Sequence, residues 1–192
     1  MMTQYNDITR FIPILILILW MGCQSESVER YRNGNDLFKT TAPSFIYFKN
    51  IKSLKYQSTR NPKTQMDFYR PKTFTKILNQ PIIFPVIIHN WLEDESYLVF
   101  EKKNISSEAR IMIMPKEGDR IVLNWPEKEY ISQLAFLRTL ENHLRHGNNI
   151  EVKEAGQDSQ IIKFSLNQRR SFSAVVQDFL KLTETLSSRA KK

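Results

Sequence analysis

Two amphipathic helical segments stand out in a chain that otherwise consists of short β-type segments. In 126–146, apolar residues such as Leu137, Leu140 and Leu144 recur three or four positions apart, which is helical spacing. A second apolar stripe of this kind follows 170–187. Most of the remaining apolar and aromatic residues fall in short runs that favour strands. These runs are 44–49, 65–70, 81–92, 96–102, 109–114, 120–125, 149–154 and 160–166.

This order of elements predicts an α+β fold. Consecutive strands joined by short turns pair antiparallel, and runs of strands followed by helices are typical of the α+β class. We expect one antiparallel sheet of about six to seven strands, with the two helices packed on one face. Pro85 interrupts 81–92 and predicts an edge strand or a bent one. Gly118 can supply a positive φ in a hairpin between 109–114 and 120–125.

An apolar run near the start of the chain predicts a targeting segment. Residues 11–21, FIPILILILWM, are followed by Gly22 and Cys23, and the chain turns polar at Gln24. A membrane-spanning helix needs about 20 apolar residues. The run is shorter than that and has the length of the apolar region of a signal peptide. We therefore expect a signal peptide over 1–22.

At Gly22-Cys23 this segment resembles the signal sequence of bacterial lipoproteins. The resemblance implies that Cys23 becomes the lipid-modified first residue of the mature chain, anchored in the cell envelope by acyl chains such as palmitate. It also implies the outer membrane rather than the inner one, because Gln24 and not Asp follows the cysteine. Residues 23–36 are then a lipid-anchored polar tether. We expect a single α+β domain over 37–192, with a short basic C-terminal tail.

The composition excludes several classes of site. Cys23 is the one cysteine of the chain, so an internal disulfide framework and a multi-cysteine zinc site are excluded. The five glycines are dispersed, so a glycine-rich phosphate-binding loop is also absent. We therefore expect no cofactor and no metal.

The net charge of +8 is not evenly spread. Residues 45–80 carry a single acid, Asp67, against eight basic side chains that we treat as a candidate basic surface. These eight are Lys49, Lys52, Lys55, Arg60, Lys63, Arg70, Lys72 and Lys76.

Three interpretations of these basic residues remain open. Strand alternation can place the aromatics of the segment in the core and the lysines in solvent. A basic surface can also contact an anionic membrane, an anionic envelope polymer or an envelope protein. Basic residues among aromatics are also typical of a groove for single-stranded nucleic acid, but an envelope address makes nucleic acid an unlikely partner.

Two groups of residues could carry chemistry. His89 could act as a general base, with one of the acids of Glu93–Glu95 orienting it. However, no nucleophile motif accompanies them, and the acidic run is typical of a solvated turn. His143 and His146 share a helix face and could ligate a metal, or they could complement the negative end of the helix dipole.

The sequence therefore predicts a lipid-anchored envelope protein with a non-catalytic binding or accessory role. The alternative is an envelope hydrolase or transferase with a site near His89 and Glu93–Glu95.

Overall fold

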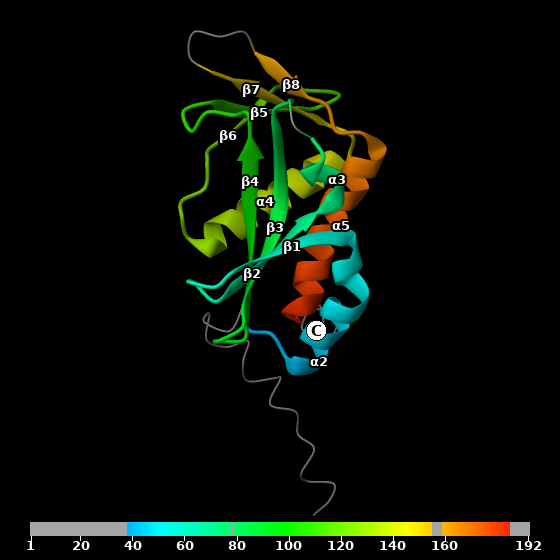
Figure 1. Cartoon of the computed structure of the whole chain (residues 1–192). Helices are drawn as coiled ribbons and strands as arrows, with labels where there is room; N and C mark the ends of the chain where they lie inside the picture. Colours follow the sequence, from blue (N-terminus) through cyan, green and yellow to red (C-terminus); the bar gives the residue numbers. More distant parts are fainter. Residues whose placement is uncertain (1–37, 78, 155–158, 185–192) are drawn as a thin grey trace, which may run out of the picture. The chain divides into compact units, whose positions relative to one another are not determined.

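The structure is a computed structural model that describes residues 38–77, 79–154 and 159–184. All of these belong to one compact unit, which spans 37–192 of the chain. They form an α+β fold with two four-stranded antiparallel sheets (Figure 1). The first sheet has the order β1-β2-β3-β4, with strands Tyr56–Asn61, Met66–Pro71, Ile82–Asn90 and Glu95–Lys103. The second has the order β6-β5-β7-β8, with Ile121–Leu123, Arg110–Met114, Asn149–Lys153 and Gln160–Ile162.

The α+β class is confirmed, but the single sheet of six to seven strands is not. After β4 the chain leaves the ladder at Asn104, which has a φ of +53°. β5 then pairs with β6 and β7 instead of with β4. The predicted hairpin is present between β5 and β6, where Gly118 has a φ of +94°. Both sheets contribute to one hydrophobic core, which contains Leu98 of the first sheet and Ile111 of the second.

β3 lies inside the first sheet, although Pro85 was expected to favour an edge. β2 pairs only with 87–90 of β3, while β4 pairs with the strand along its whole length. The half of β3 that contains Pro85 therefore has a strand neighbour on one side only. This suits a residue that lacks a backbone donor.

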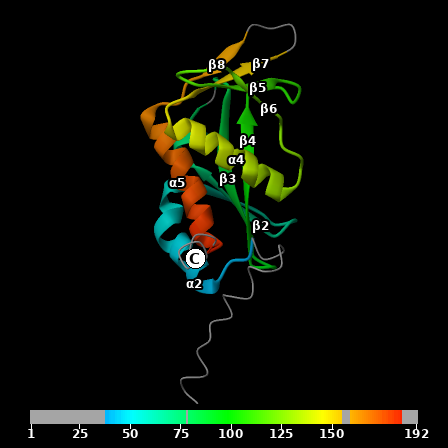
Figure 2. The same ribbon diagram turned by 180° about the vertical axis from the view of Figure 1, so that it is seen from behind.

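Both predicted helices are present and cover the same face of the first sheet. They are α4, Tyr130–Arg145, and α5, Leu166–Leu182. Figure 2 shows both helices in front of the strands, and Figure 1 shows them behind. The covered face carries Tyr69, Ile87 and Leu98, which lie opposite one another on neighbouring strands and are buried.

The beginnings of both helices differ from the predicted ones. α4 begins after Pro126, with Glu129 as its N-cap. α5 begins earlier than residue 170, because the Ser165 hydroxyl and the Gln168 side chain form a reciprocal capping box.

The strand predicted at 44–49 is wrong, because this segment is helical. Thr41 caps the segment in a capping box with Ser44, and Pro43 lies in the first turn. The helical segment comprises α2, Ala42–Tyr47, then the π-helical turn η3, Phe48–Lys52, and the 3₁₀ turn η4, Ser53–Lys55. A further short helix, α3, spans Lys72–Thr75 between β2 and β3.

Candidate functional site

Four of the eight predicted basic residues have partners that reduce their availability. Lys52 pairs with Asp178 at 3.6 Å, and Arg60 with Asp67 at 2.6 Å. Arg70 pairs with Glu101 at 2.6 Å, and Lys72 donates to the Leu54 carbonyl oxygen at 2.9 Å.

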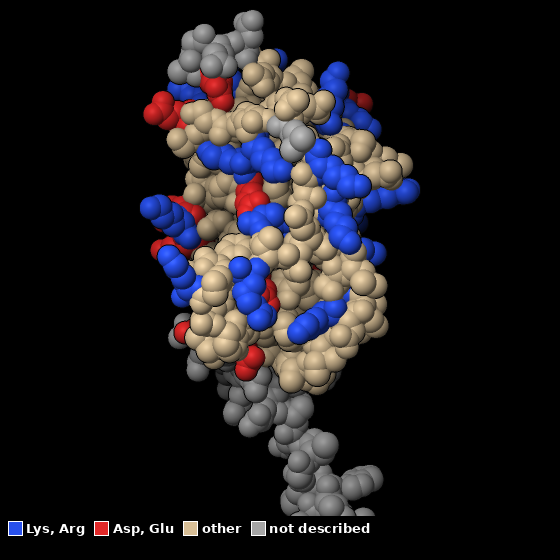
Figure 3. Space-filling model, viewed as in Figure 1, with Lys and Arg blue, Asp and Glu red and all other residues tan. Residues whose placement is uncertain are grey.

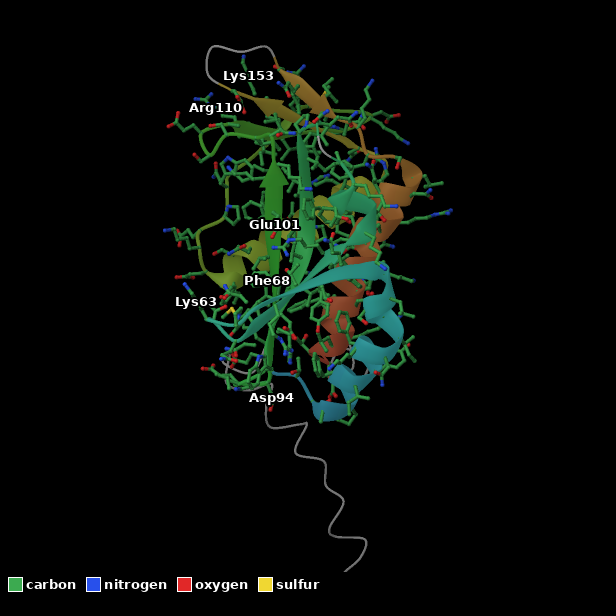
Figure 4. All side chains as sticks on the ribbon, in the orientation of Figure 1. Lys63, Phe68, Asp94, Glu101, Arg110 and Lys153 are labelled. Carbon is green, nitrogen blue, oxygen red and sulfur yellow. The ribbon has the colours of Figure 1, made fainter. Side chains whose placement is uncertain are left out.

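The acid partners come mostly from outside the basic segment. Asp178 lies on α5 and Glu101 on β4, so a local charge count over 45–80 could not find them. Figure 4 shows Glu101 at the centre of the sheet face that the two long helices leave open. Figure 3 shows basic side chains dispersed over this face among large uncharged areas. Part of the positive charge of the predicted basic surface is therefore offset by partners.

The segment from α2 to η4 combines free lysines with exposed apolar side chains. Lys49 and Lys55 are exposed and have no ion-pair partner within the described residues. We call this group the α2–η4 surface and define it by Lys49, Lys55 and four apolar residues. The exposed fractions of these four are 57% for Ile46, 49% for Tyr47, 53% for Ile51 and 72% for Leu54.

The inner side of the same segment is fixed to the core, so the outer residues have a defined direction. Phe48 is buried and packs edge-on against Tyr69 at 5.0 Å between ring centroids. Phe45 stacks on His89 at 3.9 Å. Because these aromatics occupy the inward face, Ile46 and Ile51 are left on the outward face of the segment.

Polar contacts attach the segment to the end of α5. The Ser44 hydroxyl donates to the Leu182 carbonyl oxygen at 2.8 Å, and Lys52 pairs with Asp178 of α5. The hydroxyl of Tyr56, the first residue of β1, also donates to buried Asp178, at 2.9 Å. Burial, followed by the charge of Asp178, raises the pKa of Tyr56 far above its ordinary value, so the phenol stays a donor. The apolar outer face is therefore presented by a firmly held element.

The proposed general base, His89, is buried, and Glu95 of the acidic run is held by other partners. His89 is 1% exposed, its Nδ1 lies 3.0 Å from the Ser96 hydroxyl, and its ring is covered by Phe45. Glu95 is held by Lys39 at 3.0 Å and by the Tyr97 hydroxyl. Asp94, which is labelled in Figure 4, lies in the turn between β3 and β4. This geometry supports a packing role for His89 and a turn at the acidic run.

The His89 environment predicts a pH dependence of stability. Burial is the largest influence and lowers the pKa of His89 below 6.5, although Asp67 and Asp94 oppose it. The unfolded chain then binds the proton more readily than the folded one. We expect the wild type to lose folding free energy as the pH falls below about 6.5, and His89→Gln to lose less.

Urea unfolding at several pH values between about 7.5 and 5 measures this loss. This pH range lies above the ordinary pKa values of Asp and Glu side chains. The Arg60 guanidinium also holds the pKa of Asp67, which lies near His89, below its ordinary value. Equal losses in the two proteins would contradict a neutral, buried imidazole.

The two helix histidines lie at the end of α4, as expected for either of their interpretations. The His146 Nδ1 is 2.7 Å from the Asn142 carbonyl oxygen, and the His143 Nδ1 is 3.2 Å from the Asn148 side chain. Over the described ranges, no group of three or more potential metal-ligating His, Cys, Asp or Glu residues occurs. Cys23, the predicted lipidation site, lies outside the described residues.

The α2–η4 surface was missed because the aromatic residues of 44–49 were interpreted as a strand. The signal that could have found it is the sequence Thr41-Ala-Pro-Ser44, a helix start with a proline in the first turn.

Comparison with family models, with curated proteins and with solved structures found no significant match. Among the helices of the described part of the chain, none is long and apolar enough to cross a membrane. The function is therefore argued from the geometry of the described surfaces.

Proposed function

We propose that this chain is a non-catalytic, lipid-anchored protein of the bacterial cell envelope whose folded domain binds an anionic membrane surface through the α2–η4 surface. The observation that carries the proposal is that the exposed apolar side chains of Ile46, Ile51 and Leu54 share one short segment with Lys49 and Lys55, which are exposed and form no ion pair within the described residues.

This pattern fits the physics of a helix that lies in the membrane interface. Such a helix buries an apolar face among the acyl chains and places lysines at the level of the headgroups. Isolated apolar residues on a surface are normal, but the concentration of several on one short segment favours an interaction site. Each lysine near an anionic bilayer contributes about 1 kcal/mol. The turn between β3 and β4 also exposes Trp91 and Leu92, but the adjacent Glu93 and Asp94 make it less suited to an anionic surface.

The acyl chains expected on Cys23 supply the first membrane attachment in this proposal. A basic patch adds electrostatic attraction to anionic lipids beyond what acyl chains give. The polar residues 24–36 could extend about 45 Å at most. That tether keeps the domain close to the bilayer, where the α2–η4 surface forms the second contact.

The membrane contact predicts salt-sensitive vesicle binding. We expect the chain from residue 24, which carries no anchor, to sediment with phosphatidylglycerol–phosphatidylcholine vesicles at low salt and to dissociate as salt is added. Lys49→Gln with Lys55→Gln should weaken binding about thirtyfold, from about 1 kcal/mol per lysine. Ile51→Ser with Leu54→Ser should weaken it about tenfold by removing buried apolar area.

The matched control is Arg110→Gln with Lys153→Gln. It removes the same net charge from the opposite end of the domain, where Figure 4 shows both residues far from α2. It should leave binding nearly unchanged. Equal loss in the control and in the lysine variant would show that only net charge matters.

The anchor is tested in the same preparation by the intact mass of the membrane-extracted full chain. The wild type should begin at Cys23 with added acyl mass, and Cys23→Ala should not. An unmodified wild type would refute the lipoprotein half of the proposal. Vesicle binding that is absent at low salt would refute the surface half and favour an envelope polymer or protein as the partner.

A further inference from the structure

A groove lies at the end of α5 remote from the α2–η4 surface. It is bordered by the last turn of α4, by the turn between β5 and β6, and by the first half of α5. Its volume is about 650 Å³, within the range of small-molecule sites. The lining residues are Lys116, Leu144, Arg145, Gly147, Leu166, Arg169, Arg170, Ser173, Ala174 and Gln177.

The walls of the groove are mainly apolar and open to solvent. Leu166 is 63% exposed, although it is a large aliphatic residue at the start of a helix. Leu144, Gly147 and Ala174 continue the apolar wall. Gly147, with a φ of +82°, lies close to the end of the Lys116 side chain, since a Cβ at this position would be 3.0 Å from it. Apolar walls of this kind are stabilised by covering them with an apolar ligand.

Of the six polar residues that line the groove, four are positive, and Ser173 and Gln177 are neutral. Lys116, Arg145 and Arg170 are exposed, and none has an ion-pair partner within the described part of the chain. No acidic residue lines the groove. These unpaired like charges at the edge of an apolar cavity complement an anionic group.

Arg169 has a different task from its neighbour Arg170. Its guanidinium donates to the carbonyl oxygens of Leu144 and Asn148, both at 2.8 Å, and holds the start of α5 against the end of α4. Arg169 therefore stabilises the wall of the groove, and the unpaired side chains of Lys116, Arg145 and Arg170 remain available to a ligand.

We propose that this groove binds a free single-chain amphiphile with a carboxylate head, of the fatty-acid class. The acyl chain would lie along Leu166 and Ala174, and the carboxylate would meet Arg170 and Lys116. A lipid still in the bilayer is a poorer fit. The α2–η4 surface is attached at the far end of α5, and the 17 residues of that helix extend about 25 Å. The choice of a free amphiphile over a bilayer lipid rests on the proposed membrane contact, whereas the anionic, apolar character of the ligand rests on the groove alone.

Calorimetric titration of the chain from residue 24 with sodium laurate below its micelle concentration tests this binding. We expect saturable binding of one laurate per chain. Dodecanol, which has the same chain length and no charge, should bind at least tenfold more weakly, and acetate should not bind measurably. Arg170→Gln and Lys116→Gln should each weaken laurate binding about tenfold, which is the effect of removing one charge-assisted contact.

Lys181→Gln is the matched control, because Lys181 is exposed on the same helix and does not line the groove. It should leave laurate binding unchanged. The proposal is overturned if laurate does not bind, if dodecanol binds equally well, or if Lys181→Gln and Arg170→Gln have equal effects. Binding of laurate only when it is incorporated in vesicles would also overturn it and assign the anion to the bilayer.

Discussion

Phe74→Ala should lower the free energy of unfolding by about 4 kcal/mol, the range for removing a buried phenylalanine ring. Phe74 on α3 is completely buried and stacks on Phe84 of β3 at 5.5 Å between centroids. It also meets Phe164 edge-on at 6.3 Å, and Phe164 meets Phe172 of α5 at 6.2 Å. These four rings connect the first sheet to α5 through the segment that follows β8.

Chemical unfolding followed by circular dichroism measures this loss. Thr73→Ala is the control, because Thr73 is exposed on the same short helix, and it should change stability by less than about 0.5 kcal/mol. Phe74→Leu keeps most of the volume and should fall between the two. A loss in Phe74→Ala no larger than in Thr73→Ala would show that α3 does not belong to the cooperative core.

Arg169→Ala should cost about 3 kcal/mol, because it removes four hydrogen bonds and leaves backbone carbonyl groups at the helix end without donors. Besides the carbonyl oxygens of Leu144 and Asn148, the guanidinium donates to the Phe164 carbonyl oxygen at 3.0 Å and to the Asn149 side chain at 3.1 Å. Arg169→Lys keeps the charge but lacks the planar fork of donors, so it should recover only part of the loss.

The neighbouring Arg170 provides the control for this measurement. It is exposed and makes no recorded hydrogen bond within the described residues, so Arg170→Ala should leave the midpoint of urea unfolding unchanged. The two arginines thus have different expected effects. The Arg169 variant loses stability, and the Arg170 variant loses laurate binding. Similar stability losses in both would contradict a structural role confined to Arg169.

The elements that could be predicted correctly are those whose sequence pattern lies within one continuous segment of the chain. The leucine stripe of α4 repeats over several turns, and periodicity of that length indicates a helix by itself. The β5–β6 hairpin depends on Gly118 and its immediate neighbours. By contrast, 44–49 is short and aromatic, and its β propensity outweighed the capping signal at Thr41 when the segment was interpreted without its packing partners.

The division into two sheets could not be predicted, because strand pairing depends on partners that are distant in sequence. β5 pairs with β7 across the whole of α4. The candidate surface had the same limitation. Lys52 and Arg70 look free until Asp178 and Glu101 are brought beside them by folding. The groove has no sequence signal, since its wall is assembled from α4, α5 and a turn.

The composition of β1, the first strand of the first sheet, affects whether crowded copies of this protein aggregate. β1 lies at the edge of its sheet, and the residues after Tyr56 are all polar, with Gln57 to Arg60 exposed. An edge strand that has a charged side chain and few apolar ones resists pairing with the same strand of another copy. If the domain is confined to a bilayer, copies meet repeatedly in two dimensions with this edge in reach. The polar composition of β1 would then keep such encounters from growing into intermolecular sheets.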